Sequence, residues 1–270
     1  MRRLHSFQDE GPDMGHAWSA MQRPSRPDAT LVQLLSRCYG RPRAGSRDCP
    51  LKHIVIFGTG PIAELAQFYL ETDAGRRVAG FAVDPEFVQG GAFGGKPLVA
   101  FNDLMRRFPP DTHDIFVALS YRKLNKLRRE KVDAAAALGY GIAHYVSTRA
   151  TTFATFQSAE NQFILENNTI QPFASVGRNV TLWSGNHIGH HSEIAEDVFI
   201  ASHVVVSGGV KIGPRTFVGV NVTIRDHVTI GADCIIGAGA LVLADLPAGS
   251  VLSPGATEIS RVPSHRVKNI

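Results

Sequence analysis

Cysteine is scarce in this sequence, and long apolar runs are missing. The three cysteines in 270 residues, Cys38, Cys49 and Cys234, are too few and too scattered for a disulfide framework or a zinc knuckle. No apolar run approaches the roughly 18 residues that span a bilayer, and the amino end lacks the apolar segment of a signal peptide. We therefore expect a cytoplasmic protein with reduced cysteines and no membrane insertion.

Charge of one sign is also limited. Charged residues make up 19% of the chain and the formal net charge is +4, against 44% hydrophobic residues, so one or two domains with ample core are expected. The excess of arginine lies in residues 1–50 and near residues 122–131. No recognition-helix pattern and no aromatic-interleaved basic strand accompanies it, so we expect no nucleic-acid partner.

Residues 1–50 are rich in Arg, Pro, Gly and Ser, and only residues 31–39 show helical spacing. This composition predicts a flexible arm with one short helix. The acidic residues Asp9 and Asp13 are out of place in a transit peptide. At the other end, residues 256–270 are expected to form a C-terminal tail.

Between residues 51 and 150 the sequence alternates apolar runs with helical patterns. Strands are predicted at 53–57, 78–83, 97–101, 114–119 and 142–146, and helices at 64–72, 102–108 and 122–138. This order predicts a small Rossmann-like parallel α/β domain, whose ligand normally sits at the carboxyl ends of the strands.

The loop after the first strand, GTGPIA at 58–63, is a weak dinucleotide fingerprint. Gly58 and Gly60 permit a tight turn, Pro61 can begin the helix, and Asp84 ends the second strand. A structural turn without a ligand stays open as the alternative. Further candidates for phosphate or base contacts end a later strand at the same edge: Ser120, Tyr121 and Arg122.

Residues 164–242 follow a period of six. Every sixth position carries a branched aliphatic residue: Ile164, Ile170, Val176, Leu182, Ile188, Ile194, Ile200, Val206, Ile212, Val218, Ile224, Ile230, Ile236 and Val242. Neither a helix nor an alternating strand produces this period, but a hexapeptide β-helix does. We therefore predict a left-handed parallel β-helix over residues 151–255, with the hand taken from the repeat class.

The stretch WSGNHIGHHSEIAED places His187, His190 and His191 within this repeat. Three hexads make one coil, so residues 18 apart stack, which puts Gly208 over His190 and Gly209 over His191. Two residues without side chains expose backbone N–H groups and leave a groove open beside the histidines. A tight corner of the β-helix would use the same glycines, so that alternative stays open.

The hexads, the motif NHIGHHSEI, the SGGVKIG that follows and the GTG-containing α/β domain together resemble the sugar acyltransferases of the NeuD/PglD type, over about residues 51–250. The resemblance implies transfer of an acetyl or similar group from acyl-CoA, such as acetyl-CoA, to an amine or hydroxyl of a nucleotide-linked sugar, without a metal. It connects the protein with surface polysaccharide synthesis. It also implies a homotrimer with active sites between neighbouring prisms.

The resemblance assigns roles to the histidine motif. His190 corresponds to the family's general base, which takes a proton from the attacking amine or hydroxyl, and the Gly208 N–H is the candidate donor to the oxyanion. Relatives often carry Glu or Asp after this histidine, where this chain has His191, so the partner that orients the base is left open. The candidates are a group from the adjacent chain, Glu193, Glu196 or Asp197.

Contacts to the two substrates are expected in both domains. CoA is expected along the prism wall, where missing side chains let the pantetheine approach the backbone, at Gly208, Gly209, Gly219, Gly237 and Gly239. The corresponding loop and acidic residue of the relatives hold the nucleotide part of the sugar, which implies substrate contacts at Gly58, Gly60, Asp84 and Arg122. His187, at an outward strand position, is a further substrate candidate.

The outward residues Phe199 and Phe217 would be exposed on a lone prism, which also favours a homotrimer. Three other functions stay open as alternatives. An NAD-dependent oxidoreductase would use the GTG loop, and a non-catalytic trimeric scaffold would leave the histidines idle. A metal hydratase like the γ-carbonic anhydrases would take its ligands from His187, His190, His191 and His203.

Overall fold

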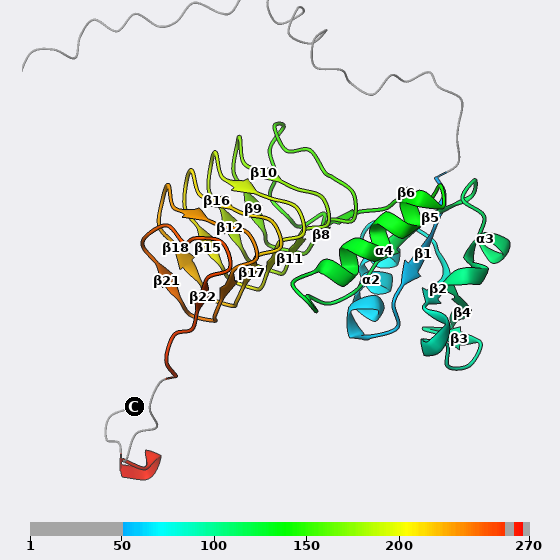
Figure 1. Cartoon of the computed structure of the whole chain (residues 1–270), viewed down its shortest axis with the longest axis horizontal. Helices are drawn as coiled ribbons and strands as arrows, with labels where there is room; N and C mark the ends of the chain where they lie inside the picture. Colours follow the sequence, from blue (N-terminus) through cyan, green and yellow to red (C-terminus); the bar gives the residue numbers. More distant parts are fainter. Residues whose placement is uncertain (1–50, 257–261, 267–270) are drawn as a thin grey trace, which may run out of the picture. The chain divides into compact units, whose positions relative to one another are not determined.

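The structure is a computed structural model that describes residues 51–256 and 262–266. The predicted arm at 1–50 and most of the predicted tail lie outside these residues. Within the described part, an α/β domain precedes a β-helix of stacked coils (Figure 1). A short 3-10 helix near the end of the chain spans Ser264–Arg266.

The α/β domain is built on one six-stranded sheet with the order β3-β4-β2-β1-β5-β6. Its strands are β1 (His53–Phe57), β2 (Val78–Val83), β3 (Ala92–Phe93), β4 (Lys96–Ala100), β5 (His113–Val117) and β6 (Gly141–Ile142). Its helices are α2 (Pro61–Thr72), α3 (Leu104–Arg107) and α4 (Lys126–Ala137), with 3-10 turns η1 (Pro85–Phe87) and η2 (Phe101–Asp103). All pairings are parallel except β3 with β4, which confirms the predicted Rossmann-like class.

Alternation along β1 explains why helices cover both faces of this sheet. Ile54 and Ile56 pack with the apolar face of α2, whereas Val55 and Phe57 pack with α3 and α4. A strand buried on both faces reads as a continuous apolar run. This is why HIVIF could be recognised from sequence.

Two predicted elements differ from the structure. The helix predicted from residue 122 begins at Lys126, because Lys123, Leu124 and Asn125 have φ of 52°, 52° and 62°, outside the right-handed helical region. The strand predicted at 142–146 is two strands. Its first part is β6 of the α/β sheet, and its second part, β7 (Tyr145–Val146), joins a sheet of the β-helix, so the chain crosses between the domains here.

The β-helix consists of two-residue strands at six-residue intervals from β8 to β21, followed by β22 after a longer connection. They are β8 (Phe163–Ile164), β9 (Thr169–Ile170), β10 (Ser175–Val176), β11 (Thr181–Leu182), β12 (His187–Ile188), β13 (Glu193–Ile194), β14 (Phe199–Ile200), β15 (Val205–Val206), β16 (Lys211–Ile212), β17 (Phe217–Val218), β18 (Thr223–Ile224), β19 (Thr229–Ile230), β20 (Ile235–Ile236), β21 (Leu241–Val242) and β22 (Val251–Leu252). Each predicted aliphatic position is the buried second residue of a strand, and together these residues fill the core. The left-handed β-helix of hexapeptide repeats is therefore confirmed.

The strands form three parallel faces. The first face contains β7, β8, β11, β14, β17, β20 and β22, the second face β9, β12, β15, β18 and β21, and the third face β10, β13, β16 and β19. The register pairs His187 with Thr169 on one side and with Val205 on the other, so residues 18 apart stack as predicted.

Each coil turns its corners with a residue in the left-handed backbone region. These corner residues recur at every sixth position: Asn161, Asn167, Phe173, Asn179, Gly185, His191, Asp197, His203, Gly209, Arg215, Asn221, His227, Asp233 and Gly239. Asn, Asp, His and Gly tolerate this conformation best, and they occupy most of these positions. The sequence therefore carries a second six-residue repeat, which the aliphatic pattern alone did not reveal.

The α/β domain packs on the first face of the prism. Tyr121 contacts Phe199 and Phe217 with ring centroids 5.0 and 4.7 Å apart. As a result Phe199 is buried and Phe217 is half-buried. The expectation that these two rings are exposed on a lone prism is therefore wrong, because the chain's own α/β domain covers them.

Helix α4 fixes this packing through a buried arginine. The Arg128 guanidinium is only 2% exposed and donates to the Asn179 Oδ1 and carbonyl oxygens, at 2.9 and 2.5 Å, and to Thr181 Oγ1 at 2.7 Å. Burial lowers the pKa of Arg128 to about 10, which still leaves it charged near neutrality. The neighbouring Arg129 binds Asp197 at 2.5 Å. Helix α4 is thus tied to one corner of the prism.

Candidate functional site

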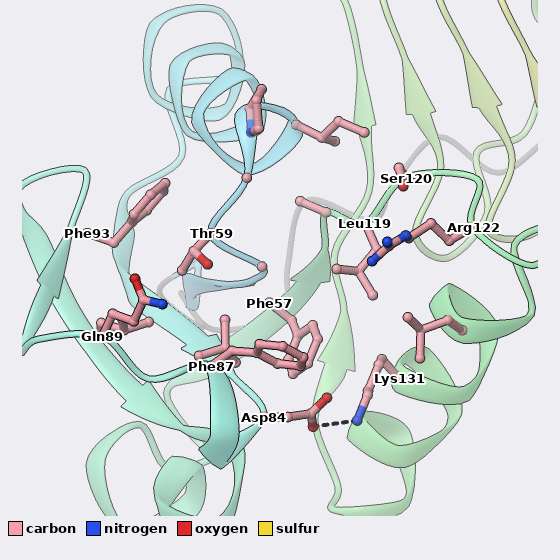
Figure 2. A pocket seen from close by; sticks show the side chains of 18 residues that line it. Phe57, Thr59, Asp84, Phe87, Gln89, Phe93, Leu119, Ser120, Arg122 and Lys131 are labelled. Carbon is pink, nitrogen blue, oxygen red and sulfur yellow. Dashed lines mark hydrogen bonds and ion pairs between the residues drawn. The ribbon is translucent and has the colours of Figure 1, made fainter.

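A cavity of about 550 Å³ opens at the carboxyl ends of β1, β2 and β5 (Figure 2). The structure brings together here most of the residues predicted to hold the nucleotide: Gly58, Gly60, Asp84, Ser120 and Arg122. Tyr121 is not among the lining residues, because it packs on the prism instead. The aromatic and amide side chains of Phe87, Gln89 and Phe93 complete the opposite side.

The glycine loop forms the wall of this cavity for specific steric reasons. Gly58 has φ +127°, and a Cβ atom there would lie 2.8 Å from the Ala118 carbonyl oxygen. Gly60 is the N-cap of α2, Pro61 begins the helix, and no atom lies within 4 Å of a Cβ at Gly60. Gly58 thus allows β1 and β5 to approach, whereas Gly60 leaves open space at the N-terminus of α2.

The floor of the cavity carries a charged pair, of which Asp84 was predicted from the sequence and Lys131 was not. Lys131 Nζ donates to Asp84 Oδ1 at 2.5 Å and lies 5.4 and 5.7 Å from the ring centroids of Phe57 and Phe101 (Figure 2). Lys131 follows Leu127 by four residues on α4, and both line the cavity. This helical spacing is the signal that could have identified the lysine.

The two adjacent histidines contact each other at the corner between the second and third faces, which we call the histidine corner (residues 189–192 and the turns stacked on it). His190 Nδ1 lies 3.1 Å from His191 Nδ1, and both side chains are exposed. The His191 ring also packs on Phe173, with centroids 4.9 Å apart. The His190 backbone N–H donates to Gln171 Oε1 at 2.9 Å. The backbone of the turn and the two rings are thereby held together.

Gly208 lies against the His190 ring, one coil further along. A Cβ atom on Gly208 would be 2.6 Å from His190 Cε1 and 2.8 Å from Nε2, and the Gly209 N–H donates to the His190 carbonyl at 2.8 Å. Among the described residues no acceptor is found for the Gly208 N–H. The predicted stacking therefore places a free backbone donor and the candidate base on the same corner.

The glycine pair does not leave an empty groove, contrary to expectation. The His190 ring occupies the space beside Gly208, and a Cβ on Gly209 would lie 2.5 Å from His227 Nδ1. His203 covers Gly185 in the same manner at another corner, with 2.7 Å to Cε1. A ring over a glycine is therefore a general feature of this prism, and the contact with a second imidazole is what sets His190 apart.

The carboxylates considered as orienting partners have other contacts. Glu193 pairs with Lys211 at 3.1 Å on the third face. Glu196 and Asp197 bind Arg129 of α4 at 3.2 and 2.5 Å, at the corner between the third and first faces. Within the described chain, the group in contact with His190 is therefore an imidazole and not a carboxylate.

His187 and the glycines proposed for CoA are dispersed over the prism. His187 lies on the second face in β12, outside the contact that joins the His190 and His191 rings.

Three of the five glycines expected to contact CoA lie at the corner between the first and second faces, whereas Gly208 and Gly209 lie at the histidine corner. A Cβ on Gly219 would lie 2.6 Å from Ala238 N, and one on Gly237 would lie 2.9 Å from Leu252 O. The same close approach occurs at Gly177, 2.7 Å from Glu196 N, so coil stacking alone accounts for Gly219 and Gly237. Gly239 is a left-handed corner residue with φ +72°.

One chain does not bring the cavity and the histidine corner together. The α/β domain covers the first face from Phe163 to Phe217, through contacts such as Phe116 with Phe163 at 5.4 Å and Tyr121 with Phe217 at 4.7 Å between centroids. In a three-sided prism, the corner joining the second and third faces is opposite the first face. The histidine corner therefore faces away from the domain that holds the cavity.

The described residues contain neither a metal-binding cluster nor a membrane-spanning helix. No group of three or more His, Cys, Asp or Glu side chains in residues 51–256 and 262–266 is placed to hold a metal ion. Nor does any helix in this part of the chain have the length and apolarity needed to cross a membrane.

The repeat and the fold both have known counterparts. Residues 173–208 and 209–244 match the family described as bacterial transferase hexapeptide (six repeats). This stretch carries the transferase hexapeptide repeat. Among curated proteins, no significant match to the sequence is found.

Solved structures resemble most of the chain at low sequence identity. PerB from Caulobacter crescentus, in complex with CoA and GDP-perosamine, is 24% identical, covering 75% of this chain and 94% of that chain, with a TM-score of 0.67. The acetyltransferase domain of PglB from Neisseria gonorrhoeae FA1090 is 22% identical, covering 74% and 95%, with a TM-score of 0.65. WeeI from Acinetobacter baumannii AYE is 20% identical over 74% and 95%, with a TM-score of 0.53. These likenesses show that the protein has this two-domain fold.

Proposed function

We propose that this protein transfers an acyl group, most simply acetyl from acetyl-CoA, to an amine or hydroxyl of a nucleotide-linked sugar. The observation that carries the proposal is the histidine corner, where the Nδ1 atom of His190 is engaged by His191 and its Nε2 side lies against Gly208. A base and a free N–H donor on one exposed corner are what acyl transfer requires. Structural neighbours with the same fold bind CoA, acetyl-CoA and GDP-perosamine, which supports these substrate classes.

The proposed step is a direct transfer. The acceptor nitrogen or oxygen attacks the thioester carbonyl carbon while His190 Nε2 takes its proton, which gives a tetrahedral oxyanion. The Gly208 N–H donates a hydrogen bond to that oxyanion. The carbon–sulfur bond then breaks, and the CoA thiolate takes up the proton from the His190 imidazolium. No covalent enzyme intermediate and no metal takes part.

The cavity of the α/β domain is the proposed site for the nucleotide. The open N-terminus of α2 at Gly60 and the Arg122 and Lys131 side chains offer donors and positive charge to a diphosphate. Asp84 is available to the ribose only through the oxygen that Lys131 leaves free. Aromatic rings at the opposite side, Phe87 and Phe93, are suited to contact the base.

Because the cavity and the histidine corner face away from each other in one chain, we propose that the site is completed between copies in a homotrimer. Phe199 and Phe217 no longer support the trimer, but apolar residues on the second face do. Val205 and Leu241 point outward there and are 41% and 60% exposed. Parallel prisms packed side by side would cover such residues and bring one chain's cavity toward another chain's histidine corner.

The test is a panel of nucleotide sugars and nucleotide amino sugars assayed with acetyl-CoA for release of free thiol. His190→Ala should lower turnover by about 10²–10⁴-fold while acetyl-CoA binding stays within a few-fold, because proton transfer acts in the transition state. His203→Ala is the matched control, since His203 is also an exposed corner histidine over a glycine. Normal turnover in His190→Ala, or thiol release that needs no sugar, would contradict the proposal.

A further inference from the structure

The contact between the two imidazoles restricts where their protons can be. His190 Nδ1 and His191 Nδ1 are 3.1 Å apart, which is hydrogen-bond distance for two ring nitrogens. A neutral imidazole carries one N–H and one acceptor nitrogen, so one of these two atoms must donate and the other must accept. The pair therefore has two neutral arrangements. Only one of them suits a base that works through Nε2.

We propose that His191 is the positioning residue of the general base, acting as a neutral hydrogen-bond acceptor in the place where a carboxylate would otherwise stand; this rests on the proposed function of His190. In the productive arrangement His190 Nδ1–H donates to His191 Nδ1, and His190 Nε2 is left unprotonated. In the reverse arrangement His191 donates, the proton of His190 is on Nε2, and the base is blocked. The arrangement of the pair thus decides whether the corner is active.

The reaction itself selects the productive arrangement. When Nε2 takes the substrate proton, His190 becomes an imidazolium with N–H donors on both nitrogens. Its Nδ1–H then needs an acceptor, which the lone pair of His191 Nδ1 supplies, and a hydrogen bond from a charged donor is stronger than a neutral one. A proton on His191 removes that acceptor. Activity therefore requires that neither imidazole of the resting pair carries an extra proton.

Other parts of the structure keep His191 in place for this role. Its backbone φ of +58° sets the ring at the corner, and the Phe173 ring packs on it. Phe173 and Gln171 on the coil below and Gly208 and Gly209 on the coil above bring no charge to the pair. Other titratable groups along this corner and the strands beside it are His187, Glu193, which Lys211 binds, and the pair Asp226 and His227, whose side chains are 4.0 Å apart.

The first test reads the protons directly and needs no activity. Protein labelled with ¹⁵N-histidine is examined by NMR at pH 8, and the signals of the pair are assigned by their loss in His190→Gln and His191→Gln. We expect His190 to be protonated on Nδ1 and His191 on Nε2. In His191→Leu, the His190 proton should move toward the other nitrogen. A wild-type His190 protonated on Nε2 would overturn the inference even if His190→Ala is inactive.

The second test separates an acceptor from a mere space-filler. His191→Leu and His191→Gln have similar size, but only Gln offers a carbonyl oxygen to Nδ1–H. Leu should lower turnover by about 10²-fold and Gln by less than about tenfold, with the KM for acetyl-CoA unchanged. The same two substitutions at His203, which has a nearly equal φ of +59°, serve as controls for backbone strain and should leave turnover unchanged. Equal losses for Leu and Gln at 191 would refute the acceptor role.

The third test uses the pH dependence of a charged variant. A carboxylate in His191→Glu would stabilise the His190 imidazolium relative to the neutral ring. The acid limb of the pH–rate profile should therefore move to higher pH in His191→Glu than in the wild type, whereas His191→Gln should not move it upward. An unshifted acid limb in an active His191→Glu enzyme would contradict the contact. If instead His190→Ala keeps full activity, the proposed function fails and the NMR result still stands.

Discussion

Replacing Gly208 by alanine should displace the candidate base with little effect on the fold. A Cβ atom at this position would lie 2.6 Å from His190 Cε1 and 2.8 Å from Nε2, whereas nonbonded carbon atoms prefer about 3.5–4.0 Å. The backbone of Gly208 is not in the left-handed region, so alanine meets no conformational penalty there. The exposed His190 ring is the part that must move, by about 1 Å.

The size of the effect follows from this displacement. A shift of about 1 Å in a catalytic group can cost about 10²-fold in rate. The backbone N–H of residue 208 remains in the alanine variant, so the loss comes from the base alone. Because the ring is exposed and can turn away, the free energy of unfolding should change by less than about 0.5 kcal/mol. We therefore expect turnover to fall by about 10²-fold while acetyl-CoA binding and the melting temperature stay close to wild type.

A double-mutant cycle provides the decisive assay. Thiol release and denaturant unfolding are measured for Gly208→Ala, His190→Ala and the double variant. In the His190→Ala background the second change should alter turnover by no more than about twofold, because the group it displaces is gone. Gly185→Ala is a comparison variant: it crowds the His203 ring in the same way but at φ +81°, so it should lose stability by about 1 kcal/mol and keep its turnover. If Gly208→Ala lowers turnover in the His190→Ala background as much as it does in the wild type, the reasoning is refuted.

Three other variants test the packing and the cavity. In a urea titration, Arg128→Met should lower the free energy of unfolding by about 3 kcal/mol, since it leaves buried acceptors unpaired. The control is Arg106→Met, at a side chain that is 82% exposed, which should change the free energy of unfolding by less than about 0.5 kcal/mol. Asp73 has its pKa raised by burial but lowered more strongly by hydrogen bonds from Thr148 and Tyr145, to about 2, below its ordinary 3.8. Asp73→Asn should therefore cost about 1 kcal/mol above pH 4, after allowance for solvent screening, and this difference should shrink as the pH falls toward 2; a pH-independent difference would contradict it. Lys131→Met should raise the KM for the nucleotide sugar about tenfold with turnover little changed, because it removes a cation and leaves the Asp84 carboxylate without its partner. An unchanged KM would exclude the cavity as the site of the nucleotide sugar.

The prism core could be predicted from sequence because one residue type recurs at a fixed interval. Each of the aliphatic positions from Ile164 to Val242 points into the core, and no loop interrupts the count. Burial on a regular scaffold leaves little choice of residue, so the period remains visible in a single sequence. The same reasoning placed Gly208 beside His190.

The start of α4 could not be predicted in this way. Lys123 and Leu124 have no preference for the left-handed region that they occupy. The contact that ends this loop is tertiary, since Asn125 Nδ2 donates to the Asp197 carbonyl oxygen of the prism at 2.5 Å. A local pattern holds no information about a partner 72 residues away. For the same reason, the sequence could not show that the candidate carboxylate Asp197 belongs to the domain contact and not to the histidines.

The imidazole pair lies between these two cases. Adjacent histidines were evident in the sequence, but their Nδ1 contact depends on the left-handed backbone of His191 and on the ring packing of Phe173. The recurrence of Asn, Asp, Gly and His at every sixth corner was a usable signal for that backbone. Lys131 was similarly recoverable from its helical spacing to Leu127, once the edge of the sheet was taken as the ligand site.

Helix α4 makes the last prediction possible, because it holds the cavity and the prism at once. Leu127 and Lys131 line the cavity, while Arg128 is fixed on the prism, so the cavity cannot turn toward its own histidine corner without breaking buried hydrogen bonds. If the site is shared between copies, two inactive variants should restore each other. Thr59→Trp, which fills the cavity from its wall, and His190→Ala are co-expressed with different tags, purified by both tags and assayed for thiol release.

In mixed trimers of these two chains, an intact cavity from the His190→Ala chain can meet an intact His190 from the Thr59→Trp chain. Activity should then rise to a substantial fraction of wild type, well above the sum of the two variants assayed alone. A control that carries both substitutions in one chain, mixed with His190→Ala, supplies no intact histidine and should stay inactive. No gain in the doubly purified complex would mean that cavity and histidine act within one chain, which the opposite placement of the first face and the histidine corner argues against.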